Sequence, residues 1–392
     1  MFRARLRHPD SGEPVDDCLA VCFPAPHSYT GDDLVEISTH GGLVVPAAAL
    51  SAFAAAGARP AEPGEFTRRA VLNGKMDLLQ AEATADLVDA GSPVQQRRAL
   101  QQLERGLSDR LAALRSEILE LEALIAYDID FPEEDEGPVS PQRVRAAWEV
   151  VRGRVADLLR TAPEGERLRE GALLVIAGRP NAGKSSLFNA LLGTERAIVT
   201  EIPGTTRDAI EAHAVIEGFP FRLVDTAGLR DSGERIERLG IEVSMKYLAA
   251  ADLVLFCEER EDPSRTAFLA QVSAPVVVVR TKADVTGEGE GVSAVTGKGL
   301  PELKQQLAQV AFGRLLALGD VEPVVTRARH RTALERALTE LDAFWAARTG
   351  GVDAAATATH LRAAVLALDD LIGAVTPEDV LDRLFAAFCV GK

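Results

Sequence analysis

Apolar and polar positions follow different periods in different parts of the chain, and each period predicts a different kind of structure. Over residues 1–71 the apolar runs are short, at 19–23 and 34–37, and an alanine-rich helix is expected over 45–56. From Leu78 onward, apolar residues recur three and four positions apart. This spacing predicts one long packed helix with a stripe formed by Leu103, Leu107, Leu111, Leu114, Ile118, Leu121 and Ile125.

Between about residues 170 and 314 the pattern changes again. Short β-rich runs at 173–177, 221–225, 253–257 and 276–280 alternate with helical segments, which predicts a doubly wound parallel sheet. Helical periodicity then returns from about residue 326 to 388. A chain of 392 residues is also too long for one core. We therefore expect a multidomain α/β plus α protein: a strand-containing domain over 1–71, a helical domain over 72–168 and 319–392, and an inserted α/β domain over 169–318.

Charge and cysteine content exclude several classes of protein. Lys plus Arg number 43 against 59 Asp plus Glu, a net charge of −16, so any contact with RNA must be local rather than a general basic coat. The spacing of Cys18, Cys22, Cys257 and Cys389 fits no zinc pattern, and free thiols in a reducing cytoplasm are expected. Cys18 and Cys22 are expected as a buried pair on one strand face. No apolar run is long enough to span a membrane.

The segment GRPNAGKS, residues 178–185, lies between a strand-like run and a helix-like run. In this context GxxxxGKS predicts a phosphate-binding loop, because the glycines let backbone N–H groups point at a phosphate. Lys184 adds a positive charge, and the Ser185 hydroxyl suits Mg²⁺. The expected contacts of the loop with a nucleotide are Asn181, Ala182, Gly183, Lys184, Ser185 and Ser186.

Further elements follow at the ends of predicted strands, where parallel sheets gather their ligands. DTAG, from Asp225 through Thr226 and Ala227 to Gly228, matches the DxxG pattern that serves Mg²⁺ and a γ-phosphate. Thr281, Lys282 and Asp284 match the (N/T)KxD base reader, and Ser293 and Ala294 follow as a backbone contact to the base. A carboxylate at Asp284 accepts from both N–H donors of guanine. Because adenine lacks that donor pair, the motif predicts GTP rather than ATP.

The segment between the phosphate loop and DTAG is expected to form a switch region, which contacts the nucleotide. Its expected nucleotide contacts are Thr200, Glu201, Ile202, Pro203, Gly204, Thr205 and Thr206. Thr206 is expected to join Ser185 on Mg²⁺. Ras-type enzymes place a glutamine directly after DxxG to orient water, whereas this chain has Leu229. Hydrolysis therefore needs another water-orienting group and another positive charge.

Several longer strings carry a resemblance to a known family. GRPNAGKSS, AIVTEIPGTTRD, DTAGLR with ERIERLGIE, FPAPHSYTGDDLVEISTHGG, PGEFTRRAVLNGKMDLLQAEA and the terminal FCVGK closely resemble the tRNA modification GTPases of the MnmE (TrmE) family, over nearly the whole chain. The resemblance implies a Ras-like P-loop GTPase domain. It also implies K⁺ held by Asn181, Thr200, Ile202 and Thr205 in place of an arginine finger. Glu237 aligns with the catalytic glutamate of the family; from the residues alone it reads as a solvated charge.

The resemblance also gives the flanking regions expected roles. It implies that residues 1–71 form a folate-binding-like α+β domain holding 5-formyl- or methylene-tetrahydrofolate at a homodimer interface, with Glu36, Lys75 and Lys392 as contacts. It further implies a heterotetramer with the FAD protein MnmG that modifies C5 of the wobble uridine of certain tRNAs. In the family, Cys389 is needed for modification and not for hydrolysis. Two arginine clusters, at 97–98 and 327–331, are candidates for tRNA phosphates or for solvated helix faces.

The sequence departs from the family pattern in several places. Thr281 stands where asparagine is commoner, giving up one amide hydrogen bond and about 1 kcal/mol. Val295 stands where lysine or arginine usually covers the base, and the first strand and helix of the folate domain are expected to be missing before Met1. Two alternatives stay open: a GTPase switch that assists ribosome or RNA assembly without folate chemistry, and an inactive GTP-binding module.

Overall fold

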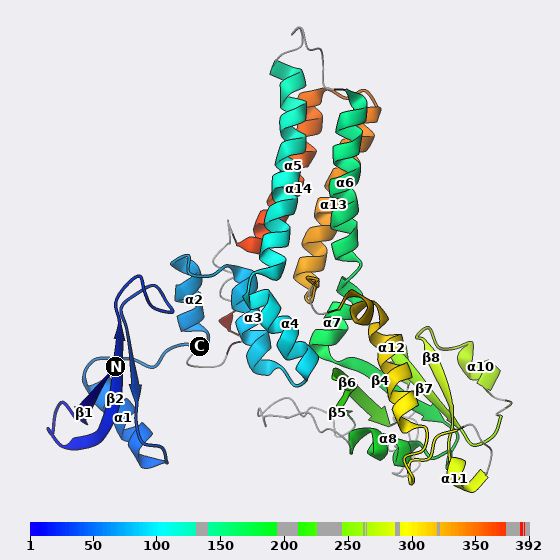
Figure 1. Cartoon of the computed structure of the whole chain (residues 1–392), viewed down its shortest axis with the longest axis horizontal. Helices are drawn as coiled ribbons and strands as arrows, with labels where there is room; N and C mark the ends of the chain where they lie inside the picture. Colours follow the sequence, from blue (N-terminus) through cyan, green and yellow to red (C-terminus); the bar gives the residue numbers. More distant parts are fainter. Residues whose placement is uncertain are drawn as a thin grey trace. The chain divides into compact units, whose positions relative to one another are not determined.

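The computed structural model describes residues 1–130, 140–193, 211–225, 245–261, 263, 265–286, 291–319, 322–373, 385–386 and 388, without the side chains of 127–130 and 286. Figure 1 shows its elements coloured along the chain. The chain separates into two compact units, one of Met1–Ala85 with Asp369–Lys392 and one of Asp86–Leu368.

The first unit contains a small antiparallel sheet. Its order is β1-β2-β3, formed by Phe2–Arg7, Pro14–Phe23 and Leu34–Ser38. Helix α1 (Val44–Ala55) packs beside β2, and Ala49 and Ala52 are its buried residues. The prediction of a buried cysteine pair is wrong: Cys18 is buried, but Cys22 is exposed. Both residues occupy the same strand parity, but burial on that face reaches Cys18 and Ala20 and does not extend to Cys22 near the end of β2.

Two phenylalanines near the C-terminus, Phe385 and Phe388, pack into the same unit. Helix α2 (Glu65–Leu72) starts after Gly64, which adopts a φ of 66°. A Cβ atom at Gly64 would lie 2.9 Å from the Phe385 ring and 3.0 Å from Phe388 Cβ, so only glycine permits this close approach. The two phenylalanines also form a buried cluster with Leu78 and Ala81 of α3 (Leu78–Asp89).

A bundle of long helices forms one part of the second unit (Figure 1). It contains α5 (Gly106–Asp130), α6 (Pro141–Leu159), α13 (Ala328–Thr349) and α14 (Ala354–Ile372), preceded by α4 (Pro93–Leu103). The stripe from Leu107 to Ile125 is buried as expected. The expected single helix is wrong at its start, because Leu103 ends α4. Arg105 takes a positive φ of 71° there and interrupts the helix before α5.

The α/β part of the second unit holds a five-stranded sheet of order β5-β6-β4-β7-β8. Its strands are Glu211–Ile216, Phe219–Asp225, Ala172–Gly178, Leu253–Glu258 and Val276–Arg280, in that spatial order. The expectation of a parallel sheet is confirmed for the four expected strands, β6, β4, β7 and β8, and the sheet has a fifth strand that was not expected, β5, which pairs antiparallel with β6. The reason is local: Glu217 and Gly218 both have positive φ and form a tight hairpin turn.

Helices accompany this sheet. They are α7 (Ala162–Glu170) before β4, α8 (Lys184–Leu192) after it, the short α10 (Arg265–Leu269) and α11 (Ala283–Thr286), and α12 (Leu300–Leu318). The residues of β4 from Ala172 to Ala177 are buried, as expected for a central strand with both faces covered. Among the residues that the structure describes, no helix combines the length and apolar character needed to cross a membrane.

Candidate nucleotide site

The phosphate loop connects the end of β4 to the start of α8. Gly178 has a φ of 139°, and a Cβ there would lie 2.2 Å from the Cys257 carbonyl of β7, so a side chain cannot fit. Asn181 (φ 62°) and Gly183 (φ 77°) also take left-handed conformations, and Gly183 is the residue that caps α8. The first-turn N–H groups of α8 therefore follow directly from the loop, where an anion is favoured.

The charged and hydroxyl side chains of the loop are held by short hydrogen bonds. Lys184 is 6% exposed, and its Nζ donates to the Arg179 carbonyl at 2.7 Å. Ser185 Oγ donates to Asp225 Oδ2 at 2.7 Å. The structure thus brings together two residues that the sequence assigned to metal binding from motifs 40 positions apart. A hydroxyl and a carboxylate oxygen side by side fit Mg²⁺, which prefers oxygen ligands.

Thr281 connects the base-reading segment to the phosphate loop. Its Oγ1 donates to the Ala182 carbonyl at 2.7 Å, its N–H donates to the Glu258 carbonyl at 2.8 Å, and the residue is 5% exposed. The expectation that threonine gives up one hydrogen bond relative to asparagine stays a prediction; the bond to the Ala182 carbonyl is one that the hydroxyl makes. The hydroxyl is short, but it still reaches the loop, because β8 ends directly beside it.

We expect Thr281→Val to weaken GTP binding by about tenfold, because the Ala182 carbonyl would lose its buried donor at a cost of about 1–3 kcal/mol. Thr281→Ser is the matched control, since it keeps the hydroxyl. Titration of both variants with a fluorescent, non-hydrolysable GTP analogue measures the difference. Equal affinities for the two variants would show that the hydroxyl of Thr281 does not connect the base-reading segment to the phosphate loop.

The remaining base-reading residues lie at the same edge. Asp284 is exposed at the start of α11, and Lys282, at a positive φ of 58°, pairs through Nζ with Glu259 Oε2 at 2.9 Å. Ser293 is fully buried, and its Oγ accepts from the N–H of Thr296 at 3.1 Å. Val295 is 82% exposed. The pairing of Lys282 with Glu259 could not be found from sequence, because no motif connects these positions.

Cys257 lies beneath the loop at the end of β7. It is 1% exposed, and the pKa of its thiol is raised to about 12, mainly by burial, with Lys184 opposing the shift and Asp225 adding to it. The thiol therefore stays protonated at neutral pH and acts as a small apolar group.

Other predicted site residues fall outside the described residues. They are Thr200, Glu201, Ile202, Pro203, Gly204, Thr205, Thr206, Thr226, Ala227, Gly228, Glu237, Cys389 and Lys392. Of the expected folate contacts, Glu36 lies exposed on β3 opposite Val21. Lys75 donates through Nζ to the Pro26 carbonyl at 2.9 Å. Their assignment to folate stays a prediction.

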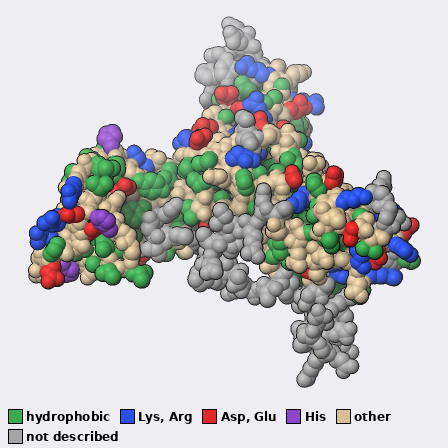
Figure 2. Space-filling view, turned by 60° about the horizontal axis from the view of Figure 1, so that its bottom comes forward, with side chains coloured by type: hydrophobic (Ala, Val, Ile, Leu, Met, Phe, Trp, Pro, Cys, Tyr) green, Lys and Arg blue, Asp and Glu red, His purple; other side chains and the backbone are tan. Residues whose placement is uncertain are grey.

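The arginine clusters do not provide a plain phosphate surface. Arg98 is 7% exposed and donates to the Glu322 carbonyl at 2.7 Å. Arg327 pairs with Asp86 at 2.6 Å, and Arg331 pairs with Glu166 at 3.1 Å. On the face shown in Figure 2, Lys and Arg side chains lie interspersed with Asp and Glu side chains. Arg98 in particular is neither a phosphate contact nor part of a solvated face.

Three features define a P-loop GTPase. A phosphate loop lies between β4 and α8, its Ser185 is hydrogen-bonded to Asp225 at the end of β6, and Thr281 of the base-reading segment is hydrogen-bonded to the loop. Comparison with known proteins narrows this class. The family model described as MnmE helical domain matches residues 78–389, and the model described as GTP-binding protein TrmE N-terminus matches residues 1–75. The chain belongs to the tRNA modification GTPase MnmE family.

Curated relatives match almost the whole chain. The tRNA modification GTPase MnmE of Methylorubrum populi is 45% identical over 99% of this chain and 88% of its own length. The MnmE proteins of Aquifex aeolicus and Salinibacter ruber are 41% and 40% identical, each over 98% of this chain and 88% of the relative. These matches support the expected multidomain α/β plus α fold and identify the chain as a GTP hydrolase of tRNA modification.

Proposed function

We propose that the chain hydrolyses GTP in a K⁺-dependent manner and that hydrolysis drives modification at C5 of the wobble uridine of certain tRNAs. In this proposal it works as a cytoplasmic homodimer that forms a heterotetramer with the FAD protein MnmG and takes its carbon unit from a tetrahydrofolate. The observation that carries the GTPase part is the contact between Ser185 and Asp225 at the edge of the sheet. Family membership supports the tRNA part.

The residues of the phosphate loop have separate tasks in hydrolysis. Backbone N–H groups at the start of α8 and the ammonium group of Lys184 bind phosphate oxygens. Ser185, Asp225 and Thr206 would hold Mg²⁺, which neutralises charge that develops on the phosphates. Asp284 orients the guanine. Glu237 would orient the attacking water, since Leu229 has no hydrogen-bonding atom to do so.

Asn181 supports the K⁺ part of the proposal. It is exposed in the loop with a φ of 62°, so its side chain is not committed to the core. Its amide oxygen, with oxygens from Thr200, Ile202 and Thr205, would bind K⁺, which supplies the positive charge that an arginine finger gives in other GTPases.

Hydrolysis in KCl is expected to exceed hydrolysis in NaCl at the same ionic strength by about tenfold or more, because the ligand set suits the larger ion and the transition state needs the added charge. Steady-state rates in both salts, with GTP affinity measured in parallel, test this. Asn181→Ala should remove the difference between the salts. Equal rates in KCl and NaCl for the unchanged protein would refute the K⁺ role.

The C-terminal segment supports a chemical role at the folate-binding-like domain. Phe388, which directly precedes Cys389, packs against Gly64 and Leu78 of that unit. Gly64 is the second residue of the PGEFT string, which is one of those that carry the family resemblance. Phe388 therefore packs beside Gly64, which lies in the domain proposed to hold the one-carbon unit.

Nucleoside mass spectrometry of tRNA tests the whole proposal. A deletion strain that receives this chain should regain C5-modified wobble uridine, and Cys389→Ser should fail to restore it while the purified variant hydrolyses GTP at the normal rate. Normal modification with Cys389→Ser would remove the cysteine from the chemistry. If the unchanged chain leaves the nucleoside profile unaltered, the second candidate, an RNA assembly GTPase without folate chemistry, gains support.

A further inference from the structure

The first turn of α4 contacts the hairpin turn between β5 and β6. The N–H of Val94 donates to the Gly218 carbonyl at 3.3 Å. The Val94 side chain is 5% exposed and belongs to the same buried cluster as the sheet residues Leu174 and Phe221. A Cβ at Gly218 would lie 3.5 Å from Val94 Cγ2. A helix of the bundle part thus contributes a core residue to the α/β part.

The hairpin connects this contact to the nucleotide site. Strand β6 ends at Asp225, the residue bonded to Ser185. Strand β5 begins at Glu211, five positions after the predicted switch threonine, Thr206. The two strands pair continuously from Glu211 with Val224 to Ile216 with Phe219. Because this ladder joins the two strands over the full length of β5, we expect a displacement at the site end of the hairpin to reach its turn.

Aromatic packing supports the hairpin at the turn end. Phe219 stacks on Phe312 of α12 at a centroid distance of 4.6 Å, and Phe221 meets the same ring edge-on at 5.6 Å. Phe312 has non-helical φ and ψ and marks a kink in α12. The N–H groups of Arg314 and Leu315 after this kink donate to the Glu164 carboxylate of α7. The turn end of the hairpin therefore packs against α12 as well as α4, although β5 is an edge strand of the sheet that the structure describes.

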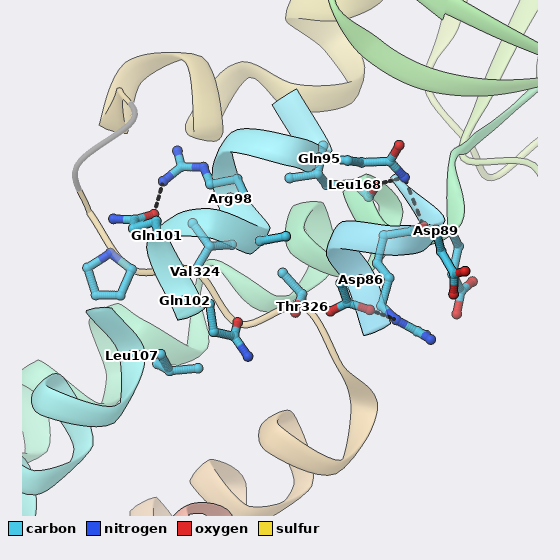
Figure 3. Close-up of a pocket in the computed structure, with 14 residues that line it drawn as sticks. Asp86, Asp89, Gln95, Arg98, Gln101, Gln102, Leu107, Leu168, Val324 and Thr326 are labelled. Carbon is cyan, nitrogen blue, oxygen red and sulfur yellow. Dashed lines mark hydrogen bonds and ion pairs between the residues drawn. The ribbon is translucent and has the colours of Figure 1, made fainter. Parts of the chain in front are cut away.

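Helix α4 also contacts the two segments through which the chain enters and leaves the α/β part. Gln95 Nε2 donates to the Leu168 carbonyl at 2.9 Å and to the Arg169 carbonyl at 3.1 Å, just before β4. Arg98 donates to the carbonyls of Gly319 and Glu322, just after α12. Figure 3 shows Gln95 and Arg98 leaving α4 toward opposite sides of a cavity of about 240 Å³.

We propose that α4 couples the nucleotide state of the site to the helical bundle. Val94 moves with the β5–β6 turn, and Gln95 and Arg98 transmit this movement to the segments that enter and leave the α/β part. These are positioning residues, because none of them touches the nucleotide site. The proposal rests on the GTPase activity of the family and does not depend on folate or K⁺.

The helix start gives the proposal a direct probe. First-turn N–H groups have no partner inside their own helix. Ser92 Oγ accepts from the N–H of Gln95 at 3.3 Å, while the N–H of Val94 depends on the Gly218 carbonyl. Protection of the Val94 amide against hydrogen exchange therefore reports the position of the hairpin turn.

Hydrogen exchange of the full chain, bound to GDP or to a non-hydrolysable GTP analogue, tests the proposal. The amides of residues 94–98 are expected to differ about fivefold in exchange rate between the two states. In Val94→Ala, GTP turnover should stay near normal while this difference disappears and wobble-uridine modification falls about tenfold. Equal exchange rates for 94–98 in both states of the unchanged protein, with the phosphate-loop amides protected in both, would overturn the proposal.

Two further variants keep the test decisive if Val94→Ala folds poorly. Gln95→Ala removes the bonds to α7 from a half-buried position and should lower modification without changing GTP affinity. Gln96→Ala changes an exposed neighbour on the same turn and should behave as the unchanged protein. Equal modification by the Gln95 and Gln96 variants would show that the contacts of α4 are only structural.

Discussion

Asp284→Asn is expected to convert this GTPase into an enzyme that prefers xanthosine triphosphate. A carboxylate accepts from both N1–H and the amino group of guanine, whereas the asparagine amide offers one acceptor and one donor. Xanthine carries a carbonyl where guanine has the amino group, so it matches the amide. The affinity for GTP should fall about 100-fold or more, because a buried base group would face a donor instead of an acceptor.

The measurement is kcat/KM for GTP, xanthosine triphosphate and ATP. Asp284→Ala is the matched control, since it should lose GTP without gaining the xanthine nucleotide. Asp284 is exposed and lies after β8, so neither change should cost much stability. If the asparagine variant still favours GTP, the base reader must include a carboxylate other than Asp284.

The phosphate loop was predictable from sequence because its chemistry is local. Gly178, Gly183, Lys184 and Ser185 need only a strand before them and a helix after them, and both flanking patterns were visible. The meeting of Ser185 with Asp225 was also predictable, since parallel strands end at one edge. The hydrogen bond from Thr281 to Ala182 was not, because it depends on where the end of β8 lies relative to the loop.

The missed features depend on backbone conformation or on distant packing. The break at Arg105 was invisible to periodicity, which records spacing and not φ. Strand β5 has the sequence EAHAVI, with too little alternation to predict a strand, and its direction depends on the turn at Glu217 and Gly218. The burial of Arg98 depends on carbonyls more than 200 positions away in sequence.

Glu237→Ala is expected to lower kcat for GTP about 100- to 1000-fold while leaving nucleotide affinity unchanged. The reason is that none of the described site residues is assigned to orient the attacking water. Lys184, Ser185 and Asp225 are assigned to phosphate or metal in the proposed mechanism, and Leu229 after DxxG cannot hydrogen-bond a water. The group that orients water contacts it mainly as the reaction proceeds, so its loss should appear in turnover and not in binding.

Glu234→Ala is the matched control, because it removes a carboxylate from the same segment of sequence. Stopped-flow binding of a fluorescent GTP analogue, together with single-turnover hydrolysis in KCl, separates affinity from chemistry. Turnover by Glu237→Ala that matches the control would move the water-orienting role to another residue. A loss of salt dependence in Asn181→Ala, with Glu237→Ala still responding to K⁺, would show that charge neutralisation and water activation are separate contributions to one transition state.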